Sequence, residues 1–187
     1  MATADELLAS AKEKMAKTIE HAKTEFSTVR TGRASASLLD RVDVDYYGTP
    51  TPLRQLSTVS VPEPRMLTIQ PFDPGSIKDI EKAIMESDLG LTPSNDGKLI
   101  RLPIPQLTEE RRKDLVKIVR NMAEEHRVAV RDIRRDTMKH LKELVDNGEI
   151  GADDEHRAEG RVDDMTGEHT KQIDDLLKHK EDEVMEV

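Results

Sequence analysis

Three stretches of the chain repeat their hydrophobic residues at the spacing of an amphipathic helix. The first runs from Ala4 to Val29 without glycine or proline, with apolar residues at intervals of three, four and seven. The second begins near Thr108, which can cap it, and continues to about Val145. The third follows a polar turn and contains two glycines, each costing about 1 kcal/mol relative to alanine. Together they predict a bundle in which each hydrophobic stripe packs against the other two.

The segment between the first two helices, about residues 32–105, has a different pattern and holds all nine prolines of the chain. The stretch RVDVDYYG alternates apolar and polar residues, as a half-buried strand requires. STVSV, MLTIQ and KLIRLPI are predicted as further strands, and SIKDIEKAIMES as a short helix capped by Ser76. The predicted fold class is therefore α+β: a long three-helix bundle, residues 1–30 plus 106–187, with an inserted small α/β domain, residues 31–105.

Two short connections join these predicted units. The stretch VRTGRASASLL ends the first helical pattern at Gly32, and Pro103 and Pro105 precede the second helix. Two short connections can act as a hinge, and motion of one unit against the other is then expected. Gly32, Pro103 and Pro105 are the predicted residues of this two-stranded hinge.

The charge of the chain is unevenly distributed. The formal net charge of −9, taken alone, disfavours nucleic acid as a partner. However, residues 107–145 hold 8 acidic and 11 basic side chains, whereas residues 146–187 hold 15 acidic and 5 basic ones. The second predicted helix is therefore locally basic, and the third strongly acidic.

A row of cations lies along one face of the second predicted helix. At about 100° per residue the cations separate from the hydrophobic face and from Asp114, Glu125, Asp132, Asp136 and Glu143, with Glu124 as an exception inside the row. This separation predicts that the cations lack partners on their own helix. The eight residues of this basic stripe are Lys113, Lys117, Arg120, Arg127, Arg131, Arg134, Arg135 and Lys142.

Arginine-rich rows of this kind suit phosphate groups, because the guanidinium group forms bidentate contacts and stacks on bases. Only 2% of the residues are aromatic, which argues against single strands bound by stacking and favours folded RNA or a duplex. Two other interpretations stay open. The stripe is either a solvated face with salt bridges, or it pairs with the acidic third helix. Arg30 and Arg33, which flank Gly32, either extend the basic surface or belong only to the helix end and linker.

The sequence contains no motif of an enzyme. NDGKLI lacks the first glycine of a phosphate-binding loop, because Thr92 occupies that place. His126 and His169 lie on hydrophobic stripes and are predicted to be core residues rather than ligands. The acidic stretch ADDEH lacks the spacing of a calcium loop. We therefore expect no catalytic residue, no cofactor and no metal.

Two absences complete the sequence-based expectations. The chain has no cysteine, which excludes disulfides and fits a cytoplasmic protein. It also lacks an apolar run long enough to span a membrane and a signal peptide at its start, so no membrane partner is expected.

Three stretches closely resemble the bacterial ribosome recycling factor family: VRTGRASASLLDRVDVDYYGTPTPLRQLSTVSV, EKAIMESDLGLTP and IRLPIPQLTEERRKDLVKIVRNMAEEHRVAVRDIRRD. The resemblance weakens over residues 146–187. It implies a three-helix bundle with an α/β domain on a hinge, in a shape that mimics transfer RNA. It also implies binding to the ribosome after translation termination, across the A and P sites of the large subunit. Elongation factor G, by hydrolysing GTP, would then drive the subunits apart, and the factor itself would catalyse no reaction.

The resemblance also implies partners for each unit. The bundle would contact ribosomal RNA of the large subunit through RDIRRD, which places Arg131, Arg134 and Arg135 in the interface, with Arg134 as the first candidate. The inserted domain would face elongation factor G and the intersubunit bridge region, and the factor would act as a monomer. A protein scaffold that binds an acidic partner is the open alternative, and competition with ribosomal RNA would separate the two.

Overall fold

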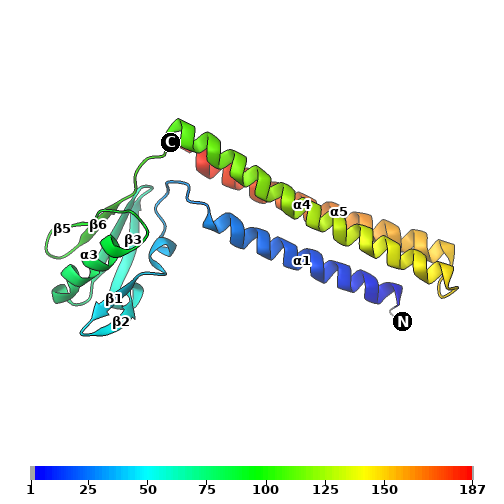
Figure 1. Ribbon diagram of the computed structural model, residues 1–187, viewed down its shortest axis with the longest axis horizontal. Coiled ribbons are helices and arrows are strands. Elements are labelled where there is room, and N and C mark those ends of the chain that lie inside the picture. Colours follow the sequence, from blue (N-terminus) through cyan, green and yellow to red (C-terminus); the bar gives the residue numbers. More distant parts are fainter. Residues whose placement is uncertain (1–2, 187) are drawn as a thin grey trace. The chain divides into compact units, whose positions relative to one another are not determined.

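The chain forms two compact units. The computed structural model describes residues 3–186. One unit comprises the chain up to Thr31 together with the chain from Glu109 onward, and the other comprises Gly32–Thr108. The first is entirely helical and the second contains all the strands (Figure 1). The expected combination of a helical bundle and a small α/β domain is confirmed.

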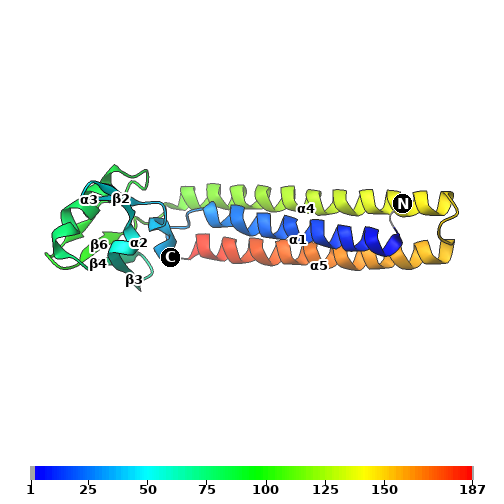
Figure 2. The ribbon, with the colours of Figure 1, turned by 90° about the horizontal axis from the view of Figure 1, so that it is seen from below.

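The helical unit consists of α1 (Ala4–Thr28), α4 (Glu109–Asp146) and α5 (Ala152–Met185). Helices α4 and α5 form an antiparallel hairpin, and α1 lies along both of them (Figure 2). At 38 residues, α4 is about 57 Å long. Each of the three helices therefore has two neighbours against which its hydrophobic stripe can pack.

The start of α1 is specified by a capping box. The Glu6 backbone N–H donates to Thr3 Oγ1 at 3.2 Å, and the Thr3 backbone N–H donates to Glu6 Oε2 at 2.8 Å. These two bonds satisfy amides that have no partner within the helix. At the other end, Val29 adopts an extended conformation with ψ of 114°, so the helix stops there.

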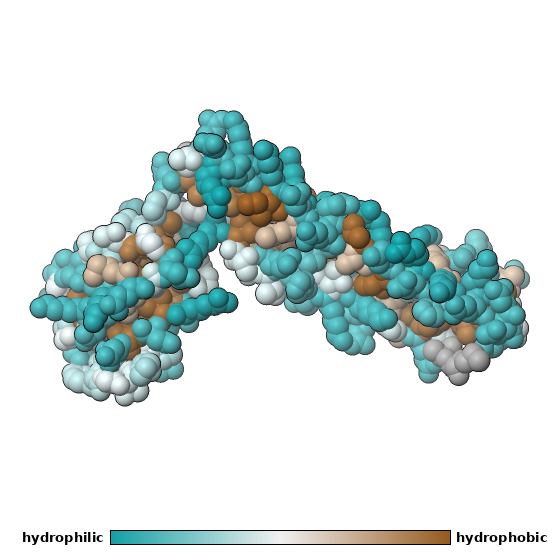
Figure 3. All heavy atoms as spheres, viewed as in Figure 1, coloured by the Kyte–Doolittle hydropathy of each residue, from teal (hydrophilic) through white to brown (hydrophobic). Residues whose placement is uncertain are grey.

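Hydrophobic side chains from all three helices meet in the core of this unit. In Figure 3 the visible face of the helical unit is largely hydrophilic, and hydrophobic side chains show only in separate patches. The predicted stripe of the first helix is buried, and so are His126 and His169, each 6% exposed. The largest cluster consists of Met15, Ile19, Ala22, Phe26, Val119, Ala123, Val130 and Ile173. A second consists of Leu8, Leu141, Ala158 and Val162.

The α/β unit contains two antiparallel sheets and one longer helix. Its four-stranded sheet has the order β3-β4-β6-β5, and β1 and β2 form a separate hairpin. The strands are β1 (Asp43–Tyr46), β2 (Thr49–Pro52), β3 (Ser57–Glu63), β4 (Met66–Pro71), β5 (Ser94–Asn95) and β6 (Ile100–Pro103). The helical segments are η1 (Ala36–Leu39), α2 (Leu53–Leu56), η2 (Pro74–Ser76) and α3 (Ile77–Glu86). This unit has its own core, in which Ile69, Ile80 and Leu102 are fully buried.

Several features of this unit differ from the sequence prediction, which contains neither α2 nor β5. Strand β2, with the sequence TPTP, was not predicted; it pairs only with β1, so its prolines lie in a two-stranded hairpin. Ser76 does not cap α3, because its hydroxyl donates to the Asp73 carbonyl at 2.7 Å. The cap is instead Asp73, which accepts from the Gly75 N–H at 2.9 Å and starts η2, and η2 leads directly into α3.

The predicted hinge residues occupy different kinds of position. Gly32 has φ of +76°, and a Cβ added there would lie 3.2 Å from Leu107 Cγ, so both conformation and space favour glycine. Pro103, in contrast, is the last residue of β6 and pairs with Met66. The Ile104 N–H also donates to the Arg65 carbonyl at 2.8 Å, which ties the chain to the sheet as far as Ile104. Pro105 follows this tie, in the connection to α4.

Two glycines inside α5 lower its stability without a packing role. A Cβ at Gly160 or Gly167 would meet no atom within 4 Å, and both residues are exposed. We expect Gly160→Ala and Gly167→Ala each to raise the free energy of unfolding by about 0.5–1 kcal/mol, measured by urea denaturation. Gly148→Ala is the control, because that site is equally open but has φ of +73°, and it should be destabilising. A Gly160→Ala variant no more stable than wild type would contradict this account.

Candidate nucleic-acid interface

The basic stripe lies on α4, as the sequence predicts. Arg127 and Arg134 are half-buried, and the other six residues of the stripe are exposed. Arg120, Arg127 and Arg134 are seven residues apart and therefore occupy the same side of the helix. No helix within residues 3–186 is long and apolar enough to cross a membrane.

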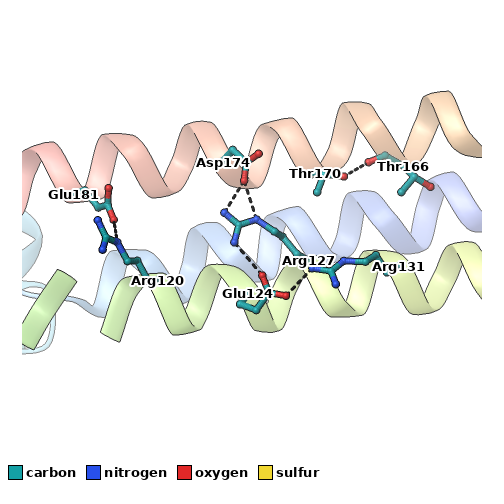
Figure 4. Close-up of polar contacts among 8 residues, drawn as sticks. All are labelled: Arg120, Glu124, Arg127, Arg131, Thr166, Thr170, Asp174 and Glu181. Atoms are coloured by element: carbon teal, nitrogen blue, oxygen red, sulfur yellow. Dashed lines mark hydrogen bonds and ion pairs between the residues drawn. The ribbon is translucent and has the colours of Figure 1, made fainter. Parts of the chain in front are cut away.

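These three arginines face carboxylates of α5. Arg120 pairs with Glu181, Arg127 Nη2 lies 2.6 Å from Asp174 Oδ1, and Arg134 Nε lies 2.6 Å from Asp163 Oδ1. Figure 4 shows the first two pairs, with the guanidinium groups reaching from α4 to α5. We call the three pairs Arg120–Glu181, Arg127–Asp174 and Arg134–Asp163 the interhelical ladder.

The third pair departs from the register of the first two. One step of seven residues along α4, from Arg120 to Arg127, corresponds to a step of seven backward along α5, from Glu181 to Asp174. The next step places Gly167 opposite Arg134, and glycine offers no carboxylate. Arg134 reaches instead to Asp163, one helical turn beyond, and its side chain stays 42% exposed, compared with 22% for Arg127.

Further pairs form within α4 itself. Glu124 accepts hydrogen bonds from Arg131 Nη2 at 2.6 Å and from Arg127 Nη1 at 3.2 Å (Figure 4). The bonds from Arg131 and then Arg127 hold the pKa of Glu124 below its usual value. Arg135 pairs with Asp132 at 2.8 Å, and Lys113 with Glu109 at 2.8 Å.

The prediction that the cations of the stripe lack partners on their own helix is therefore wrong for four of them, Lys113, Arg127, Arg131 and Arg135. Six of the eight have carboxylate partners, and only Lys117 and Lys142 form no ion pair within residues 3–186. The helical-wheel argument failed because Glu109 and Glu124 lie inside the stripe and Asp132 lies within one turn of Arg135. In addition, long arginine side chains reach the neighbouring helix. The alternative, pairing with the acidic third helix, is confirmed for the three arginines of the interhelical ladder.

Most of these pairs remain open to competition from phosphate. The five paired stripe residues other than Arg127 keep side chains 42% exposed or more, and exposed ion pairs contribute about 0–1 kcal/mol each. A phosphate group offers several acceptor oxygens to the same guanidinium group. The pairs therefore hold the arginines in place without blocking them from an anionic ligand.

Arg127 is the exception, because its side chain is only 22% exposed and contacts two carboxylates. Its partial burial would lower its pKa, but hydrogen bonds to Asp174 and Glu124 outweigh that effect and raise its pKa. Two carboxylates on two helices thus hold one guanidinium group. The geometry suits Arg127 to fixing α5 against α4 more than to contacting a ligand.

The two flanking arginines lie outside α4. Arg30 and Arg33 are exposed residues of the segment that follows α1, on either side of Gly32. They belong to different units, since the boundary falls between Thr31 and Gly32. The stripe lies on the single helix α4, so the positions of its residues relative to one another are known, and the candidate site is described from the stripe alone.

Sequence reasoning missed the specific partners on α5. Asp163, Asp174 and Glu181 were recognised only as part of an acidic segment. A signal was present: seven residues separate Asp174 from Glu181, as they separate Arg120 from Arg127. Matching heptad spacings of opposite charge on two helices of a hairpin indicate interhelical pairs.

Comparison with known proteins places this architecture in one family. A sequence model of the family described as ribosome recycling factor matches residues 22–185. A ribosome-recycling factor from Rubrobacter xylanophilus is 52% identical over 180 residues, which cover 96% of this chain and 97% of the relative. Another, from a Geobacillus species, is 54% identical over 182 residues, covering 97% and 98% respectively.

Solved structures give the same result. A solution structure of the ribosome recycling factor matches with a TM-score of 0.77 and 38% identity, covering all of both chains. A second match, with a TM-score of 0.65 and 44% identity, covers 99% of this chain and 100% of the other. It is a model of the T. thermophilus ribosome recycling factor, with E. coli elongation factor G, bound to the E. coli post-termination complex. The resemblance noted in the sequence is thus confirmed, and the chain belongs to the ribosome recycling factor family.

Proposed function

We propose that this protein recycles ribosomes: it binds the post-termination ribosome and, with elongation factor G and GTP, promotes separation of the subunits for a new round of translation. The match to a recycling factor bound with elongation factor G to a post-termination complex, over 99% of this chain, carries the proposal. The family consists of translation factors rather than enzymes, so this protein assists a reaction driven by elongation factor G. Such a role takes place in the cytoplasm.

The helical unit is proposed to bind ribosomal RNA of the large subunit. Support comes from the basic stripe, whose exposed arginines are held by weak, replaceable ion pairs. Arg131, Arg134 and Arg135 of RDIRRD are the main contacts in this proposal. Lys113, Lys117 and Arg120 extend the surface along α4, Arg127 supports it, and Arg30 extends it past α1. Arg33 belongs to the other unit and is proposed as a separate contact.

The α/β unit is proposed to act on elongation factor G and the intersubunit bridge region. It has a core of its own, so it can behave as a separate body. Gly32 and Pro105 lie in the connections and would permit it to swing, whereas Pro103 would move with the sheet to which it is bonded. The protein is proposed to act as a monomer.

Competition with RNA separates this function from that of a protein scaffold. Co-sedimentation of the protein with isolated large subunits should decrease when excess ribosomal RNA is added, because both present the same phosphates. Binding should also weaken as salt rises, since phosphate contacts release counterions. An equal concentration of an acidic protein is the control and should displace little. A complex that survives excess ribosomal RNA would contradict RNA recognition and favour the scaffold.

A further inference from the structure

Three potential metal ligands meet where α1 packs on α4. His21 and Glu25 lie one turn apart on α1, and His126 lies on the hydrophobic side of α4. One ligand atom from each residue lies within 4.8 Å of the other two. His126 Nε2 is 2.7 Å from Glu25 Oε2, and the two imidazole rings meet edge to face with their centroids 5.4 Å apart. Residues distant in sequence thus place two imidazoles and one carboxylate around a single point.

The donor set has the chemistry of a transition-metal site. Two imidazole nitrogens and one carboxylate oxygen form a set that zinc and neighbouring divalent ions bind, with water completing the coordination. The i,i+4 spacing of His21 and Glu25 directs both side chains to one face of α1. We propose that His21, Glu25 and His126 bind one divalent transition-metal ion of the zinc class, which clips α1 to α4.

Only small side-chain movements separate the observed geometry from a tetrahedral site. With bonds of about 2.0–2.2 Å, the donor atoms around zinc lie about 3.3 Å apart. The Glu25–His126 pair is closer than this and must open, and no pair of donor atoms in the cluster is farther apart than 4.8 Å. His21 is exposed and Glu25 half-buried, so both can rotate about their side-chain bonds.

The burial of the three residues fits an ion entering from solvent. His126 is buried and held in one place by the core, Glu25 is half-buried, and His21 forms the exposed side of the cluster. Among residues 3–186 no other three histidine or acidic side chains approach one another this closely. Other histidines differ: His169 Nδ1–H donates to the Met165 carbonyl, and His179 pairs with Glu183 but belongs to no cluster of three potential ligands within residues 3–186.

A metal at this point would stabilise the helical unit. Glu25 and His126 are separated by 101 positions in the chain, so the site exists only in the folded protein. An ion bound only by the folded state shifts the folding equilibrium toward that state.

The sequence predicted His126 to be a core residue and no metal ligand, because the pattern along one helix does not show which residue of another helix lies opposite.

The test uses the full-length protein without a histidine tag, stripped with a chelator and titrated with zinc or cobalt. Calorimetry should show one ion per chain, and cobalt should give visible absorption. Saturation at about a hundred times Kd should raise Tm by roughly 5 °C or more. His21→Ala should lower the affinity at least about tenfold and Glu25→Gln should do the same. Circular dichroism should stay unchanged in His21→Ala, because that residue is exposed.

His179→Ala is the matched control, because His179 and Glu183 repeat the i,i+4 pair on α5 without a third ligand. It should leave zinc affinity and the Tm shift as in wild type. No binding up to about 1 mM zinc would overturn the proposal. So would binding that persists in His21→Ala, or that is lost in His179→Ala, because the ion would then occupy surface histidines elsewhere. In each of these outcomes, the contact between Glu25 and His126 is a hydrogen bond between two helices and not part of a metal site.

Discussion

Arg134→Glu is expected to weaken binding to the large ribosomal subunit by at least about 1–3 kcal/mol, the scale of a lost charge-assisted contact. Arg134 lies in RDIRRD, is 42% exposed, and reaches past Gly167 to its partner Asp163. The substitution removes a cation from the proposed phosphate-binding surface and adds a repulsive charge. Co-sedimentation with isolated large subunits over a range of concentrations measures the change.

Two variants distinguish binding from folding at this position. Asp163→Asn breaks the same ion pair but leaves the arginine, so ribosome binding should stay equal to wild type or become tighter. The exchange Arg134→Glu with Asp163→Arg keeps opposite charges on the two helices, so thermal stability should return without full binding. If Asp163→Asn weakens binding as much as Arg134→Glu does, or if melting changes in step with binding, Arg134 is a structural residue.

Replacing residues 32–108 with a flexible linker of about ten residues is expected to abolish subunit separation while preserving binding to the large subunit. The core of the helical unit is built from α1, α4 and α5 alone, so this unit should fold without the insertion. The removed part is the unit proposed to meet elongation factor G. Light scattering of ribosomes with elongation factor G and GTP measures separation, and co-sedimentation measures binding.

Circular dichroism provides the control for this deletion, since the shortened protein must keep a cooperative helical melt. Separation at the rate of the intact protein would show that the α/β unit is dispensable and would contradict the proposed division of roles. Loss of large-subunit binding by a protein that still melts cooperatively would also contradict it, because the RNA contacts would then not lie on the helical unit alone.

The fold could be largely predicted because long helices carry a strong periodic signal. The stripe from Leu8 to Phe26 repeats over many turns, and the structure buries it as expected. Short elements carry weaker signals. Strand β2 consists of alternating threonine and proline, which propensity does not favour in a strand, and only its pairing with β1 forms it. Asp73, and not Ser76, is the capping residue, because η2 comes directly before α3 and the cap lies at the start of η2.

The basic stripe was predicted in position, but the ion pairs that its residues form were not predicted. Charges along α4 show which face is basic, and that face is observed. Pairing depends on how α5 is aligned with α4, which a single helix does not specify. Gly167 illustrates this. The register of the hairpin places this glycine, which has no carboxylate, opposite Arg134, so Arg134 pairs with Asp163 instead. The cluster of His21, Glu25 and His126 was missed for the same reason.

Light scattering of post-termination ribosomes tests the central claim most directly. The account predicts that scattering falls as subunits separate only when this protein, elongation factor G and GTP are all present. Omitting any one of the three, or replacing GTP with a non-hydrolysable analogue, should leave the signal nearly unchanged. If scattering stays constant with all three present, while the protein is folded and bound to ribosomes, the chain shares the architecture of recycling factors but does not recycle ribosomes.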